Sequence, residues 1–329
     1  MYASGSFAGQ VNSGYYFYNS VIKPLLTAAG APWSFVEDYV VGTTTYSTWK
    51  SVASGNHSGM DWYVTFGYQT PAQSTGSTVF NVYAHEVYNA STHTWNRPLI
   101  NCLQTPSAYT PVFDSANQNA FTSSSPNTVG SPYTAAQIGA GSTGAAECYF
   151  QMGTSGVVSG GLYSYLVAYN ADGLALGLWG ASPGFCYVGA FASYVANDHP
   201  LFGFGFFQTG ATGNTNYAAV SRDPVAGGAA NTYPFLVGTS TTTAYVRSGM
   251  GTTNFLTPDA YVGGPWCAQL LIGKTSANPP TSGFQRGQSP DWLLMSTSGA
   301  NNGDTVMING QAYTALANAP WYLAVSQAA

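Results

Sequence analysis

Residues 162–178 read LYSYLVAYNADGLALGL, and this stretch indicates the fold class of the chain. Two apolar segments, 162–170 and 174–178, have the length of β-strands. The Asp172-Gly173 pair between them is a dipeptide typical of tight hairpins. Strands joined so closely are antiparallel neighbours. We therefore expect an antiparallel sheet around the middle of the chain.

Further strands are expected on both sides of this hairpin. Period-two alternation begins at Trp33, and segments rich in aromatic and β-branched residues follow at 46–50, 61–68 and 78–88. More candidates lie at 147–152, 186–191, 304–313 and 321–325. Within the third of these, Asn309-Gly310 predicts a type I′ turn.

One amphipathic helix is expected before these strands. The apolar residues of segment 18–26 recur at i, i+3, i+4, i+7 and i+8, and Gly30 follows as a stop signal. Pro24 removes a backbone donor inside this segment, so we expect the helix to kink or to restart there.

The expected fold class is therefore mainly β, with α+β character at the N-terminus: antiparallel sheets or a sandwich, one helix and long loops rich in Gly, Ser and Thr. Segments 103–144 and 199–230 are expected to be loops. We divide the chain into a helix-plus-sheet domain (1–100), a loop-rich connection (101–144) and a C-terminal antiparallel β domain (145–329). A single composite sandwich is the alternative.

Charge is scarce in this chain. Its 329 residues include 7 Lys and Arg and 12 Asp and Glu, so 6% are charged and the net charge is -5. An ordinary soluble domain has about 25%. An uncharged polar surface suits burial in an assembly. The chain has no basic cluster of the kind that supports nucleic-acid binding, so we expect no nucleic-acid partner.

Targeting signals and cysteines add little. No apolar run approaches the roughly 20 residues of a membrane-spanning helix, so no membrane insertion is expected. The first residues lack the basic start and apolar core of a secretory signal, which favours a cytosolic start. The four cysteines are far apart and are expected to be buried thiols. They are Cys102, Cys148, Cys186 and Cys267.

A search for catalytic motifs finds none, and we predict no catalytic residue, no cofactor and no metal site. His85 and Glu86 adjoin on an expected strand, as do Glu37 and Asp38, so the members of each pair should point to opposite faces. His85 and His93 flank an expected turn, but two imidazoles without a nearby acid make a poor metal site. We interpret them as surface polarity.

Aromatic residues are the strongest candidates for contacts. The run from 202 to 207 is expected to be buried in the core or between subunits rather than to bind a ligand, and each fully buried Phe contributes about 1.5–3 kcal/mol. The predicted interface residues are Phe202, Phe204, Phe206, Phe207, Trp266 and Trp292.

Several segments resemble a family of virion structural proteins of tailed bacteriophages. The middle block, 163–176 followed by 186–191 and 199–202, is the most specific. The remaining segments are 33–37, 46–50, 61–66, 303–313 and 321–325. Together they cover about half of the chain. The family usually carries basic residues after Asn-Ala, whereas this chain has Asp172-Gly173.

The resemblance implies a non-enzymatic structural subunit of the phage neck, tail or baseplate, assembled in the host cytoplasm and located in the virion. Its partners are copies of itself and other virion proteins. The alternative is a carbohydrate- or receptor-binding module at the particle tip, with a host-surface glycan as partner. A lectin of this kind would place two or three tryptophans in one exposed groove, drawn from Trp62, Trp95, Trp179, Trp266 and Trp292.

A third and weaker alternative is a cell-wall glycan hydrolase. Such an enzyme needs two facing carboxyl groups about 5–10 Å apart. The carboxylates that long-range folding could bring together for this purpose are Glu86, Glu147 and Asp172.

Overall fold

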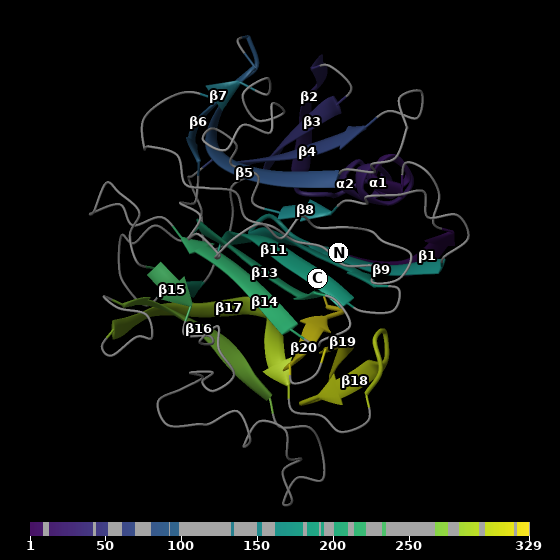
Figure 1. Cartoon of the computed structure of the whole chain (residues 1–329), viewed down its shortest axis with the longest axis vertical. Coiled ribbons are helices and arrows are strands. Elements are labelled where there is room, and N and C mark those ends of the chain that lie inside the picture. Colours follow the sequence, from purple (N-terminus) through teal and green to yellow (C-terminus); the bar gives the residue numbers. More distant parts are fainter. Residues whose placement is uncertain are drawn as a thin grey trace, which may run out of the picture.

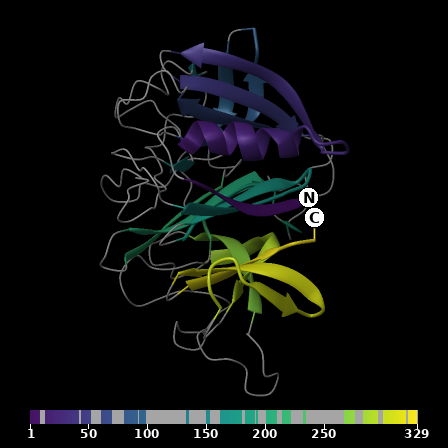
Figure 2. The same ribbon diagram turned by 90° about the vertical axis from the view of Figure 1, so that its right-hand side faces the viewer.

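Antiparallel pairing organises the described strands into three sheets, and the expected mainly-β class is confirmed. The computed structural model describes residues 1–8, 13–41, 44–51, 61–69, 80–91, 93–98, 133–134, 150–152, 162–179, 183–190, 192–193, 201–209, 214–221, 232–234, 267–275, 283–295, 300–318 and 321–328. The sheets are stacked as layers, with the single helical segment between the first two (Figures 1 and 2).

The first sheet contains the expected strands of the N-terminal region. Its order is β2-β3-β4-β5-β6-β7, and β8 also pairs with β5. The strands are β2 (Trp33–Val41), β3 (Thr44–Ser51), β4 (Tyr63–Gln69), β5 (Phe80–Asn89), β6 (Thr94–Pro98), β7 (Tyr133–Thr134) and β8 (Phe150–Met152).

The middle sheet contains the expected hairpin of residues 162–178. Its order is β1-β9-β10-β11-β13-β14, so the first strand of the chain pairs with one from its middle. The strands are β1 (Tyr2–Ala8), β9 (Leu162–Tyr169), β10 (Gly173–Trp179), β11 (Pro183–Ala190), β13 (Leu201–Thr209) and β14 (Asn214–Ser221).

The last sheet is built from the C-terminal region. Its order is β15-β16-β17-β20-β19-β18, and β12 also pairs with β17. The strands are β12 (Ala192–Ser193), β15 (Thr232–Pro234), β16 (Cys267–Thr275), β17 (Gly283–Met295), β18 (Thr305–Ile308), β19 (Gln311–Asn318) and β20 (Trp321–Ser326).

The helix restarts at Pro24, as expected. An α-helical turn, α1 (Ser13–Tyr16), leads into a π-helical stretch, η1 (Phe17–Ile22), and then into α2 (Lys23–Leu26). The Lys23 N–H donates to the carbonyl of Tyr18, five residues back. Pro24 therefore falls in the first turn of α2, where its missing N–H costs little.

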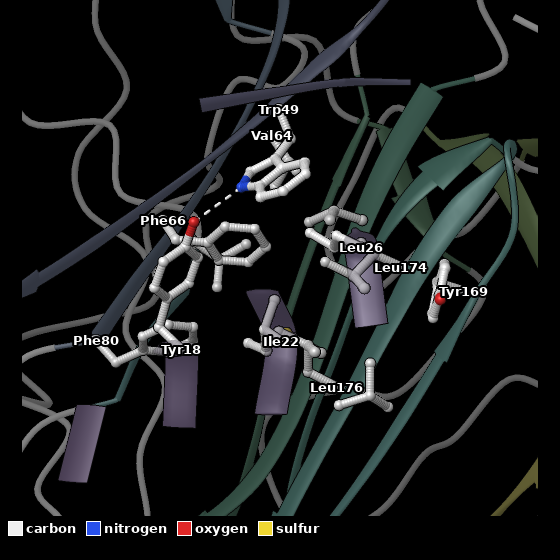
Figure 3. Close-up of a cluster of buried hydrophobic side chains, with 14 of the residues drawn as sticks. Tyr18, Ile22, Leu26, Trp49, Val64, Phe66, Phe80, Tyr169, Leu174 and Leu176 are labelled. Carbon is white, nitrogen blue, oxygen red and sulfur yellow. Dashed lines mark hydrogen bonds between the residues drawn. The ribbon is translucent and has the colours of Figure 1, made fainter. Parts of the chain in front are cut away.

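One hydrophobic core joins the first and middle sheets through this helix. The helix contributes buried residues to both sides of this core. Tyr18 packs beside Phe66 of the first sheet, and Ile22 lies beside Leu176 of the middle sheet (Figure 3). Residues from segments 1–100 and 145–329 thus share a core.

Both predicted turns form, with different chemistry. At the C-terminal hairpin Asn309 and Gly310 have φ values of 51° and 81°, as a type I′ turn requires. The turn between β9 and β10 has a backbone hydrogen bond from Asn170 N to Gly173 O (3.0 Å), and a side chain supports it as well. Asn170 Oδ1 accepts hydrogen bonds from the N–H groups of Asp172 (2.8 Å) and Gly173 (3.0 Å).

The expected loop at 199–230 is wrong in two places, because β13 and β14 lie within it. In residues 202–206 Phe alternates with Gly. This is the period-two pattern of a strand, but glycine is uncommon in strand interiors, so the sequence alone favours a loop. Most of the other expected loop, 103–144, lies outside the described residues.

Candidate functional site

The predicted phenylalanine patch occupies an interior strand. Phe202, Phe204, Phe206 and Phe207 all belong to β13, which pairs with β11 on one side and β14 on the other. The backbone of Phe204 is in register with Tyr187, and that of Phe206 with Phe185. The side chains of the four phenylalanines lie outside what the structure describes.

Trp292 is not at an exposed interface of the chain. It has no exposed surface, and its ring lies 5.7 Å from Phe185 and 6.3 Å from Tyr187. Its interface assignment is therefore corrected: it packs the last sheet onto the middle sheet. Trp266 lies outside the described residues.

The tryptophans whose side chains the structure describes are all buried. Trp33 Nε1 donates to the carbonyl of Asn170 (3.0 Å), and Trp49 Nε1 donates to Tyr18 Oη (3.0 Å). The others are Trp62, Trp179 and Trp292. The indole of Trp95, on β6, is not described. These five rings do not offer a groove in which a sugar could stack.

An acid–imidazole pair, not expected from the sequence, joins β2 to the turn between β5 and β6. His93 Nδ1 lies 2.9 Å from Glu37 Oε1, and Tyr88 Oη donates to the same oxygen. The His93 ring stacks on Tyr39, with centroids 4.1 Å apart and planes 11° apart. The interpretation of His93 as an imidazole without a nearby acid is therefore wrong. As expected, Asp38 faces the opposite side of β2, towards Lys23 and Ser47.

This cluster is suited to holding a turn in place. His93 has a φ of 51°, in the left-handed region that His enters more readily than most residues. Burial, and then the hydrogen bond to Glu37, raises the pKa of Tyr88, so its phenol stays a donor. Within the described ranges no three His, Cys, Asp or Glu side chains gather as metal ligands.

A second polar network anchors the helix to the first sheet. Tyr18 Oη hydrogen-bonds Ser47, and Ser47 donates to Asp38, which also faces Lys23 at 3.3 Å. Burial raises the pKa of Tyr18. The hydroxyls of Tyr18 and Ser47 and the indole N–H of Trp49 all have partners within this network, so it stabilises the packing of the helix.

Within the described residues, the structure does not bring together the three carboxylates that a glycan hydrolase would use, Glu86, Glu147 and Asp172. The backbone of Glu86 lies in β5, but its side chain is not described, and Glu147 lies outside the described residues. Asp172 sits in the turn between β9 and β10.

A small cavity lies between the middle and last sheets. It measures about 20 Å³ and is lined by residues that include Tyr169, Ala175, Tyr187, Trp292 and Ser326. A water needs about 10–15 Å³ on the same measure, so the cavity fits a single water rather than an organic ligand.

Sheet edges differ in how they are protected. On β2 a bulge shifts the register between Phe35 and Glu37, and the strand carries two acidic side chains. β1 has an unbroken register from Tyr2 to Ala8, no charge and no proline, and Ser4, Gly5 and Ser6 are exposed. Bulges and charges are the usual devices that keep an edge from pairing. Among the described strands, β1 pairs only with β9.

Among the described residues no helix has both the length and the apolar character needed to cross a membrane. Cys186 is buried, as expected. Neither a scan against protein-family models nor a search of curated proteins finds a match for the chain.

Proposed function

We propose that the chain is a structural subunit of a tailed-phage virion, in the neck, tail or baseplate, that acts through contacts with copies of itself and with other virion proteins. The observation that carries this proposal is the edge of β1, which is exposed, uncharged and regular. Such an edge offers backbone donors and acceptors to another protein, and proteins that remain monomeric usually block it.

Composition supports the same role. With 6% charged residues, the surface is hydrated by Ser, Thr, Asn, Gln and Tyr. Ser, Thr, Asn and Tyr side chains lose less conformational entropy on burial than Lys or Arg, and none of these polar side chains creates like-charge repulsion between copies. The resemblance of about half of the chain to phage structural proteins points the same way.

The arrangement of side chains favours assembly over the two alternatives. A glycan-binding module needs exposed rings, whereas the described tryptophans serve the cores. A glycan hydrolase needs two facing carboxylates, whereas Glu37 is engaged with Tyr88 and His93 and Asp38 with Ser47 and Lys23.

Immunogold labelling of intact particles from the phage that encodes the chain tests this function. We expect gold at one fixed position on each particle and the chain among the proteins of purified particles. Particles that contain none of the chain would overturn the proposal, and binding to a glycan array would then favour the receptor-binding alternative.

A further inference from the structure

The backbone of β1 shows which of its groups point outward. Met1 and Tyr169 exchange two hydrogen bonds, from Met1 N to Tyr169 O (2.6 Å) and from Tyr169 N to Met1 O (2.8 Å). In an antiparallel ladder such pairs recur at every second residue. The register is continuous, so Ala3, Gly5 and Phe7 also bond to β9. The N–H and C=O groups of Tyr2, Ser4 and Ser6 therefore point away from the sheet.

The sequence of β1 is complementary to itself when it is read in the antiparallel direction about Gly5. Ser4 then faces Ser6, Ala3 faces Phe7, Tyr2 faces Ala8 and Gly5 faces itself. Each large side chain meets a small one, and the hydroxyls meet each other. Pairs of this kind are the unit that stabilises a sheet.

The underlying sheet supports this edge from one side. Phe7 stacks on Tyr163, with centroids 5.5 Å apart, and Tyr165 covers Gly5 so closely that a Cβ there would lie 2.7 Å from Tyr165 Oη. An aromatic ring over a glycine at an edge keeps the strand extended. β1 and β9 carry no charged side chain, so two such edges do not repel each other.

We infer that β1 pairs antiparallel with β1 of a second copy of this chain, about a two-fold axis at Gly5. In this arrangement Ser4 of one copy and Ser6 of the other exchange backbone hydrogen bonds, and the two six-stranded middle sheets become one continuous sheet. The contact is isologous, so it closes after two copies. The inference deepens the proposed assembly role by naming the surface and the partner.

Light scattering on the full chain, over a concentration series, tests the pairing. We expect the wild type to reach twice the 34.4 kDa mass of one chain. The double variant Ser4→Lys/Ser6→Lys places lysines opposite each other across the axis and should halve the mass. A matched control, Ser34→Lys/Ala90→Lys, places the same charges at exposed positions on β2 and in the turn after β5 and should leave the dimer intact.

A charge-swapped partner separates loss of pairing from misfolding. The variant Ser4→Glu/Ser6→Glu should also be monomeric, and mixing it with the lysine variant should restore a dimer that contains one of each. Rescue of this kind requires the two edges to face each other. A wild type that stays monomeric, a dimer that both double variants retain, or assemblies that grow beyond two copies would overturn the inference.

Cysteine crosslinking tests the register. Paired residues that exchange hydrogen bonds have Cα atoms about 5.5 Å apart, which a disulfide spans, whereas diagonal neighbours are about 7–8 Å apart. A mixture of Ser4→Cys and Ser6→Cys chains should therefore crosslink between residues 4 and 6, as peptide mapping would show, and neither variant alone should crosslink at its new cysteine. Crosslinking of Ser4→Cys to itself would overturn the axis at Gly5.

The outcomes for function and for pairing are separable. Labelled particles together with a monomeric chain would leave the virion role standing and remove this interface. A dimer that the lysine variant breaks, together with unlabelled particles, would leave the interface standing and remove the virion role.

Discussion

The two faces of β10, in the middle sheet, are both buried but are filled in different ways. On the face towards the helix, β10 contributes Leu174, Leu176 and Leu178 to the shared core. On the face towards the last sheet the same strand has Gly173, Ala175 and Gly177 before it ends at Trp179, and larger side chains of neighbouring strands and of the last sheet fill the space over the glycines. There a Cβ on Gly177 would lie 3.3 Å from Leu316 of β19.

This difference follows from the shape of each neighbour. A helix is a cylinder that leaves grooves along its sides, and long aliphatic side chains reach into them. Stacked sheets lie about 10 Å apart, so large residues on one layer need small ones opposite. From Gly173 to Leu178, β10 therefore alternates in side-chain volume rather than in polarity, as expected for a strand covered on both faces.

Truncation on the helix side should have the largest effect. Leu176 is buried in the shared core, and Leu176→Ala removes its packing and leaves a cavity, at a cost of about 2–5 kcal/mol in the free energy of unfolding. Urea titration followed by tryptophan fluorescence measures this cost. Val40→Ala, at an exposed position, should change stability by less than about 0.5 kcal/mol. Similar losses in the two variants would contradict the helix-side packing.

Enlargement on the other face should come next. The Cβ of Gly177→Ala would lie 2.7 Å from Leu166 Cγ, and such overpacking costs about 1–3 kcal/mol. Combining it with Leu166→Ala makes room for the new methyl group. The double variant should therefore be more stable than the sum of the two single losses predicts, with a coupling of about 0.5–3 kcal/mol. Strictly additive losses would refute the steric explanation.

Alkaline pH should weaken the helix side. Burial raises the pKa of Tyr18 and of Tyr68 above the ordinary value near 10. Above pH 10 the unfolded chain loses these protons while the folded chain keeps them, so stability falls with rising pH by up to about 1.4 kcal/mol per pH unit for each group. Urea titrations from pH 8 to pH 11 should show a shallower fall for Tyr18→Phe. An equal slope would mean that Tyr18 titrates alike in both states.

The smallest effect is expected for Ala175→Gly. Loss of the methyl group enlarges a cavity that already borders this side chain, and glycine raises the entropy of the unfolded chain, so we expect a cost of about 1 kcal/mol. Thermal unfolding measures it. A cost as large as that of Leu176→Ala would show that β10 side chains contribute equally to packing on the two faces, which would contradict the difference between these faces.

Local signals in the sequence identify most of the elements, and long-range contacts account for what they miss. The restart at Pro24 and the turn at Asn309-Gly310 follow from backbone chemistry within a few residues. β13 is missed because glycine breaks its apolar pattern. The contact of Glu37 with His93 joins residues 56 apart, on different elements, and no local pattern encodes it.

The candidate interface is missed for the same reason. The centre of β1, Ala3 to Ser6, consists of small residues that do not favour a strand by themselves, and the segment becomes a strand because β9 supplies the partner. Hydropathy therefore marks Trp292 and the phenylalanines as candidates for contacts. The exposed edge becomes visible only in the assembled sheet.

The pairing of β1 with β9 also determines when β1 can form its strand during translation. The partner of Met1 is Tyr169, 168 residues later in the chain. At a translation rate of about 5–20 residues per second, β1 waits roughly 10–30 s before its partner has been made. During that interval both of its edges are open. Completion of the middle sheet is thus a late, non-local step, and it makes the first strand the part of the nascent chain most in need of protection.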